Sequence, residues 1–278
     1  MSFLRLCDDD PLLSTLRDVF DCHPIGVPDE RVLPLTVVAS DGSKSRFRGA
    51  LSPLLVGAPV MDVPIAFADM SNLSLKRTNA IKTDLGLKIL EGFLSGFGLP
   101  SAGIKASFSG ATKLSFAFKE VRRQYIDVNL LGRRLATQRL DLKNPAASIF
   151  GEGGYEFLLL DSVIQSRDFM LSVESNAGAR FSVDIPALQE IVQKADAGIS
   201  IDGSTQKEVF FRGPKHLTFA FACVRLFVDA NGTITALPPA DKVPALKGYL
   251  ASSPDRIIHY TPDRVLLGSI PALLTFDP

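Results

Sequence analysis

A ten-residue phrase that occurs twice constrains how this chain can fold more than any other feature. Residues 113–122 (KLSFAFKEVR) and 216–225 (HLTFAFACVR) share Leu, two Phe, Ala, Val and Arg in register, with Ser115 answered by Thr218. In each copy Leu and the two Phe alternate with small or polar residues, which is the period of a β-strand. No third copy follows, so the pair is not part of a short-period repeat array. We therefore predict two structurally equivalent strands in one sheet.

Other segments predict an α+β fold around that sheet. Helices are expected over Asp10–Phe20, from Ile81 to a point near Gly96 or Gly98, and after Asp184, which is a good N-cap. The turn signals Ser40–Ser43 and Asp229–Gly232 predict hairpins. The expected strands are Arg31–Ala39, Lys44–Leu51, Ile104–Phe108, Leu114–Leu130, Tyr155–Ser162, Phe169–Ser175, Arg180–Val183, Glu208–Arg212, Leu217–Val228 and Thr233–Leu237.

Composition and charge narrow the class of protein. The 278 residues are 46% hydrophobic and 22% charged, which suits a globular protein with a substantial core. Thirty basic residues balance thirty acidic ones, so the overall charge gives no case for nucleic acid. Three cysteines without a CxxC pair favour a reducing compartment. No secretory signal and no apolar run of ~20 residues is visible, so we expect a soluble, cytoplasmic protein.

The C-terminal segment is punctuated by proline but ends in apolar residues. A disordered tail would be polar, so this one is expected to lie against the body, tethered by an accessible linker near Tyr249–Tyr260. The residues expected to make that contact are Val265, Leu266, Leu267, Ile270, Leu273, Leu274 and Phe276.

Catalytic motifs are scarce, and we predict neither an enzyme nor a metal site. His23, His216 and His259 are isolated in sequence and form no ligand pair. No nucleophile elbow, P-loop or dinucleotide fingerprint is present. The glycine-rich stretch 151–154 precedes a strand pattern rather than a helix, so it indicates a turn.

Two local features leave alternatives open. The basic stretch 113–143 fits a solvated strand face, an RNA surface or a surface for anionic lipid headgroups, and its apolar residues alternate with the polar positions in a way that suits lipid better than RNA. Cys7 lies among apolar residues ahead of the first helix. It is either a buried, inert thiol or an acylation site.

Taken together, these features resemble the bacterial gasdermins. The resemblance is carried by Leu6-Cys7, the helix Asp10–Phe20, the paired strands and above all the stretch Phe211–Phe221, FRGPKHLTFAF. It implies a twisted, mainly antiparallel central sheet with peripheral helices and a short docked C-terminal peptide. The loop at Val27–Arg31 departs from the pattern of many relatives.

The resemblance also implies a function. A pore-forming body, residues 1–250, would be held soluble as a monomer by an autoinhibitory peptide, residues 251–278. A neighbouring protease would remove that peptide, and the body would then oligomerise into large β-barrel pores among the phospholipids of the inner membrane, killing the cell in anti-phage defence. Cys7 maps to the palmitoylated cysteine of the family, and no other cofactor is expected.

The physical requirements of such a change suggest where it happens. Strands that cross a membrane need ~9–11 residues with alternating apolar side chains. The expected membrane-strand residues are Leu114, Phe116, Phe118, Val121, Tyr155, Phe157, Leu159, Phe169, Leu171 and Val173. Exposure of polar residues between two prolines favours cleavage within Ser252, Ser253, Pro254, Asp255, Arg256, Ile257 and Ile258.

Two alternatives to a pore-forming protein remain. One is a lipid- or acyl-chain-binding module that never inserts into the membrane. The other is a hydrolase with a dispersed site that uses a serine or Cys7.

Overall fold

The computed structural model describes residues 23–40, 45–70, 81–97, 99, 104–151, 155–175, 183–195, 198–205, 207–229, 231–237 and 274–275. The predictions for the helix Asp10–Phe20, for Cys7 and for the cleavage segment lie outside these residues.

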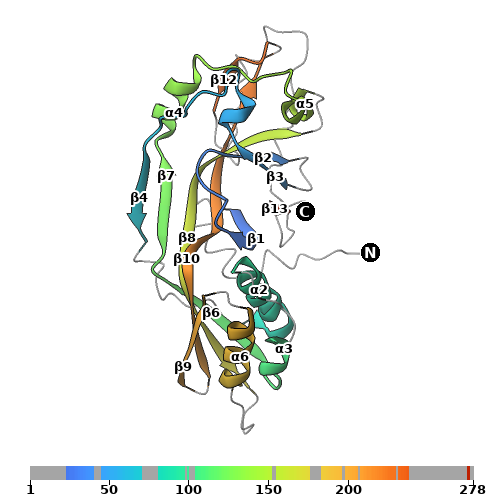
Figure 1. Cartoon of the computed structure of the whole chain (residues 1–278), viewed down its shortest axis with the longest axis vertical. Helices are drawn as coiled ribbons and strands as arrows, with labels where there is room; N and C mark the ends of the chain where they lie inside the picture. Colours follow the sequence, from blue (N-terminus) through green and yellow to red (C-terminus); the bar gives the residue numbers. More distant parts are fainter. Residues whose placement is uncertain are drawn as a thin grey trace.

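A single long strand, β8 (Glu156–Glu174), runs through the middle of an eleven-stranded sheet within the described part (Figure 1). Antiparallel β10 (Glu208–Arg225) flanks one side of β8, and three shorter antiparallel strands share the other side. Those three are β6 (Lys113–Lys119), β7 (Arg122–Ile126) and β2 (Thr36–Ser40). Two outer strands, β1 (His23–Asp29) and β9 (Ser200–Thr205), lie beside β10. On the other side, β3 (Ser45–Ala50) lies beside β2 and is followed by β13 (Leu274–Thr275). The last two are β4 (Ile65–Asp69) beside β7 and β5 (Ile81–Lys82) beside β6. A separate hairpin joins β11 (Phe227–Val228) to β12 (Ile234–Ala236).

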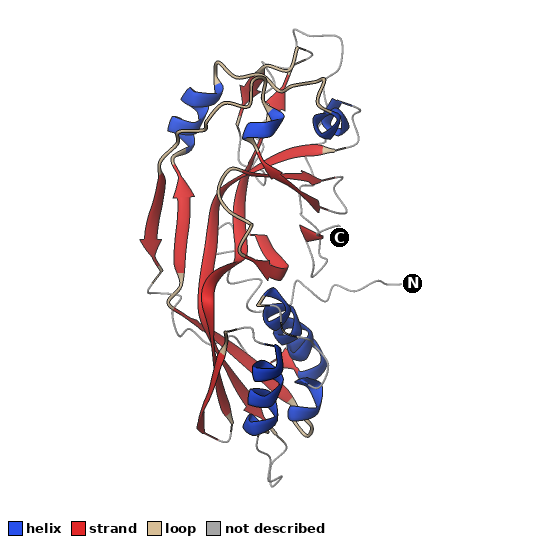
Figure 2. Cartoon of the chain, in the orientation of Figure 1, coloured by secondary structure: helices blue, strands red, loops and turns tan. Residues whose placement is uncertain are grey.

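Helices gather at both ends of the elongated molecule (Figure 2). At one end α2 (Thr83–Gly96), α3 (Ile104–Ser107) and α6 (Ile185–Ala195) cover one side of the sheet, and at the other end lie α4 (Val128–Leu135), α5 (Pro145–Gly151) and a 3-10 turn at Ser52–Leu54. Local capping explains two of the starts. The Asp184 carboxylate accepts a hydrogen bond from the Ala187 backbone N at 3.0 Å, and Asp127 does the same for Asn129 at 2.8 Å.

Three apolar clusters form the core of the part that the structure describes. The largest joins α2, α3 and α6 to strands β6, β8, β9 and β10, the second fills the end near α4 and α5, and the third lies against β8 and β10 on the other side of the sheet. Burial on both faces explains why β8 shows almost no polar alternation. Tyr155–Ser162 and Phe169–Ser175, expected as two strands, are consequently parts of one.

The two copies of the ten-residue phrase, residues 113–122 and 216–225, do lie in one sheet, as predicted, on opposite sides of β8. They are not at equivalent heights, because Ser115 pairs with Ser172 whereas Thr218 pairs with Gln165. A register shift between Thr218 and Ala220 also breaks the alternation in the second copy, so that Phe219 and Phe221 enter different apolar clusters.

Several predicted boundaries were wrong for physical reasons. Leu114–Leu130 forms strands only as far as Ile126, with a break at Glu120 in the left-handed region (φ 48°), and Asp127 is the N-cap of α4. Ile104–Phe108 contains helix α3, because a short apolar run does not distinguish a strand from a buried helix. Asp202-Gly203, a dipeptide typical of turns, lies inside strand β9. The two predicted hairpins and helix α2 are confirmed.

Candidate functional site

The residues expected to enter a membrane are covered by protein in this structure. All are buried except Tyr155, which is half-buried. Seven of them share one cluster with apolar residues of α2, α3 and α6: Leu114, Phe116, Phe118, Val121, Phe169, Leu171 and Val173. Stacked rings tie the strands together there, with centroid distances of 4.6 Å for Phe118–Phe219 and 4.7 Å for Phe169–Phe211. The remaining three, Tyr155, Phe157 and Leu159, pack in the second cluster.

The helices α2, α3 and α6 therefore cover the apolar face of these strands. Leu90 and Leu94 of α2 and Leu188 of α6 are almost completely buried against the strands. Each such side chain gains roughly 1.5–3 kcal/mol from burial. Moving the helices away from the sheet would lose several of these burial free energies unless another apolar environment covered the strands in their place.

The ladder of backbone hydrogen bonds is irregular at one level of the sheet, which we call the bend. The bend consists of Glu120–Val121 between β6 and β7, Ser166–Asp168 of β8 and Arg212–Leu217 of β10. Between Arg212 and Leu217, β10 advances five residues while its partner β8 moves two, from Asp168 to Ser166. The Ser166 hydroxyl donates to the Lys119 carbonyl at 2.6 Å and accepts from the Asp168 backbone N at 3.2 Å. Side-chain hydrogen bonds thus replace the missing ladder.

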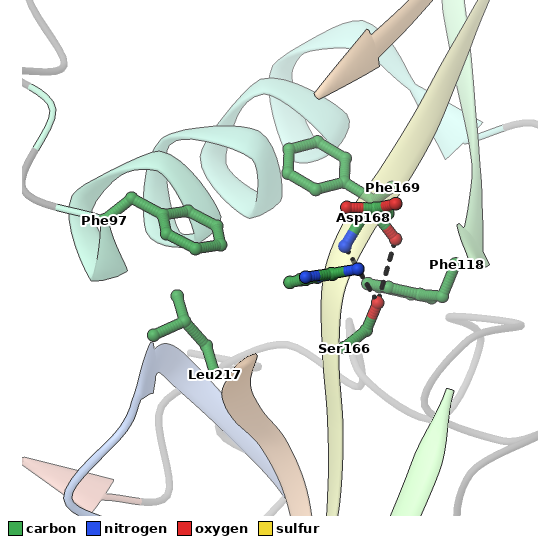
Figure 3. Close-up of a pocket in the computed structure, with 7 residues that line it drawn as sticks. Phe97, Phe118, Ser166, Asp168, Phe169 and Leu217 are labelled. Atoms are coloured by element: carbon green, nitrogen blue, oxygen red, sulfur yellow. Dashed lines mark hydrogen bonds between the residues drawn. The ribbon is translucent and has the colours of Figure 1, made fainter. Parts of the chain in front are cut away.

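A small hollow lies beside the bend (Figure 3). Phe97, just past the end of α2, and Leu217 of β10 lie across it from Phe118, Ser166 and Asp168. Its space is close to that of one water molecule, far below a substrate pocket of about 300 Å³ or more. Asp168 is only 3% exposed and pairs with Arg212 at 3.0 Å through Oδ2, while its Oδ1 has no hydrogen-bond partner among the described residues.

A buried polar row crosses three strands next to the bend. Gln124 Nε2 donates to Gln165 Oε1 at 2.9 Å, Gln165 Nε2 donates to the Thr218 hydroxyl at 3.1 Å, and that hydroxyl donates to the Val32 carbonyl at 2.6 Å. Slipping any strand by one residue would leave buried amides unpaired, so the row holds β7, β8 and β10 in register.

Sequence reasoning missed this row and the Asp168–Arg212 pair. One signal was available, because Gly213-Pro214 interrupts an otherwise strand-like segment, and such residues inside a strand mark a bulge.

The basic stretch 113–143 does not form one patch. Lys113 lies on β6 near one end of the molecule and Arg134 on α4 near the other (Figure 1). Ion pairs offset part of the charge, with N–O distances of 3.9 Å for Lys113–Glu174 and 3.7 Å for Arg134–Asp62. The stretch is divided among three elements, which weakens the expectation of a single binding face.

The described part of the C-terminal segment is the short strand β13 (Leu274–Thr275), which pairs in parallel with the outer edge of β3. Leu274 lies opposite Ser45 and Thr275 opposite Arg46. The other expected contacts, Val265, Leu266, Leu267, Ile270, Leu273 and Phe276, lie outside the described residues. So do the proposed cleavage residues Ser252, Ser253, Pro254, Asp255, Arg256, Ile257 and Ile258.

No group of three or more His, Cys, Asp or Glu side chains in the part of the chain that the structure describes is placed to hold a metal ion. Cys223 is buried. Among the helices that the structure describes, none is long and apolar enough to cross a membrane.

An elongated, curled, mainly antiparallel sheet with helices at its ends is the fold of a solved bacterial gasdermin from Bradyrhizobium tropiciagri. The two structures align with a TM-score of 0.57 at 14% sequence identity, over 83% of this chain and 92% of the other. The expected fold class is therefore confirmed.

Sequence comparison identifies the family. The model of the Bacterial Gasdermin Family matches residues 25–233, and the chain belongs to this family. A gasdermin bGSDM from a Vitiosangium species is 27% identical over 237 residues, which cover 84% of this chain and 86% of that protein. Another from a Desulfuromonadales bacterium is 27% identical over 249 residues, covering 88% and 91%. Membership supports a pore-forming gasdermin, and gasdermins are in general not enzymes.

Proposed function

We propose that this chain is the inactive precursor of a membrane pore and has no catalytic activity of its own. Its membership in the bacterial gasdermin family supports the class. The observation that carries the proposal is β8, whose 19 residues exceed the ~9–11 that a membrane-crossing strand needs. On one face of the sheet, its apolar side chains Ile164, Phe169, Leu171 and Val173 pack in one cluster with the helices α2, α3 and α6, which could be displaced.

The C-terminal segment is proposed to keep the precursor inactive. Strand β13 occupies the outer edge of β3, and an unpaired strand edge is a template for pairing with another chain. A short parallel pairing is weak, but a covalent tether keeps its local concentration high. Cutting the tether removes that advantage and opens the edge.

The remaining steps rest on the family resemblance. A dedicated protease would cut within 252–258, and the freed body would leave the cytoplasm, assemble with copies of itself in the inner membrane and end the life of a phage-infected cell. Palmitate on Cys7 would strengthen membrane attachment, since each buried CH₂ contributes about 0.8 kcal/mol.

Dye release from liposomes of bacterial lipid tests the proposal. The full-length chain carries a site for a sequence-specific protease in place of residues 252–258, and a scrambled site is the matched control. Adding the protease should release dye only from the cleavable version. Cleavage that leaves the liposomes intact would contradict the proposal. If the cleaved protein then binds liposomes without releasing dye, a non-inserting lipid module is the better description.

A further inference from the structure

Register places several charged side chains beside the polar row at the bend. Arg122 and Thr218 both pair with Gln165, on opposite sides of β8. Both β7 and β10 run antiparallel to β8. Glu120, Arg167 and His216 therefore form a second row, two positions closer to the bend than Arg122, Gln165 and Thr218 respectively. The ion pair between Arg167 and Glu120, at 2.9 Å, confirms that the second row is formed.

Within the described residues, not every charged side chain of these two rows has an ion-pair partner. Asp69 of β4 lies opposite Arg122 in the sheet. Arg167 is paired with Glu120, and the nearby Asp168 is paired with Arg212. Arg122 donates through Nε to the neutral Gln165 side chain at 3.1 Å and lies 5.7 Å from the Phe67 ring, but it has no carboxylate within ion-pair distance among the described residues. His216 is half-buried and makes no side-chain hydrogen bond in the same part of the chain.

The pKa values of Arg122 and His216 agree with the absence of a neighbouring carboxylate partner in the described part of the chain. Burial, followed by repulsion from Arg167, lowers the pKa of Arg122. Burial, followed by repulsion from Arg122 and Arg167, lowers the pKa of His216, and the opposing attraction of Glu120 and Asp168 is smaller. Both groups therefore lose part of their tendency to hold a proton, which an additional negative charge would restore.

We propose that Arg122, Arg167 and His216 form a binding site for a tetrahedral oxyanion of the phosphate type, on the face of the sheet where Gln165 and Thr218 lie. Guanidinium groups offer several N–H donors in a planar arrangement that suits phosphate oxygens, and a protonated imidazole adds another. The anion is either a free phosphate group or the phosphate of a lipid headgroup. This inference does not depend on pore formation.

Calorimetric titration of the full-length chain with sulfate, at constant ionic strength in chloride, tests the site. Sulfate keeps its charge near neutral pH, so any pH dependence belongs to the protein. Affinity should rise as pH falls from 8 to 6, because bound anion favours protonated His216. Arg122→Gln should weaken binding roughly tenfold or more, which is typical of a lost charge-assisted hydrogen bond. His216→Gln should remove the pH dependence.

Arg133→Gln is the matched control, since Arg133 is exposed on α4, which lies at one end of the molecule and away from the bend (Figure 1). It should leave sulfate binding unchanged. Equal losses in Arg133→Gln and Arg122→Gln, or unchanged binding in Arg122→Gln, would overturn the proposal. If Arg122→Gln does not fold, the pH profile of His216→Gln decides.

Sedimentation with vesicles distinguishes the two sources of the anion. Vesicles of phosphatidylglycerol are compared with vesicles of phosphatidylcholine alone, for the full-length chain and for the Arg122→Gln and His216→Gln variants. Loss of binding to the anionic vesicles in both variants identifies a lipid headgroup. Unchanged vesicle binding with lost sulfate binding identifies a soluble anion.

Discussion

Gly213 tests how tightly α2 is held against the bend. A Cβ atom added to Gly213 would lie 2.0 Å from Phe97 Cε1 and 2.5 Å from Cζ. The Phe97 ring is 9% exposed and lines the hollow, so it has little free space to enter. Gly213→Ala should therefore lower the free energy of unfolding by about 1–3 kcal/mol, the usual cost of overpacking, as measured by urea denaturation.

A double-mutant cycle separates this clash from a backbone effect. Phe97→Leu removes the ring atoms that the new methyl group would meet, so the double variant should lose less stability than the sum of the two single variants. Gly132→Ala is the matched control, because its added Cβ meets nothing nearer than 3.7 Å and it lies inside helix α4. It should be neutral or stabilising by roughly 0.5–1 kcal/mol. Strictly additive losses for Gly213 and Phe97 would refute the proposed packing.

Three further changes address capping, pH and register. Asp184→Ala removes the N-cap of α6 and should cost about 1 kcal/mol in the free energy of unfolding, with Asp184→Asn retaining most of it. Burial alone would raise the pKa of Asp29, but hydrogen bonds from the Arg31 side chain and backbone lower it below the ordinary 3.8. A carboxyl group with a lowered pKa stabilises the fold above its unfolded pKa, so the stability difference between wild type and Asp29→Asn should shrink as pH falls below 3.8, and a constant difference would contradict this. Gln165→Leu breaks its three side-chain hydrogen bonds and should cost about 1–3 kcal/mol for each partner left unsatisfied, a loss that an unchanged denaturation midpoint would rule out.

Features with local causes could be predicted from the sequence. Asp184 marks the start of α6 because its cap hydrogen bond reaches only three residues. The hairpin between β2 and β3 follows from Asp41-Gly42, which suits a tight turn. The repeated phrase predicted two strands of one sheet, since period-two alternation is itself local.

Features with distant causes could not be predicted. Gln124 and Gln165 are 41 residues apart, and Gln165 and Thr218 are 53 apart, so nothing in a local window joins them into a row. The break at Glu120 depends on how β6 and β7 follow β8, not on the residue type. Which helices cover the apolar strands likewise depends on packing between segments far apart in the sequence.

The central position of β8 has a consequence for synthesis on the ribosome. Its partners come from both directions along the chain: β2, β6 and β7 precede it, and β10 follows it. One side of β8 therefore stays without its neighbour until translation has passed Arg225. During that interval the nascent chain presents a long apolar edge, a state that is prone to aggregation and that molecular chaperones protect.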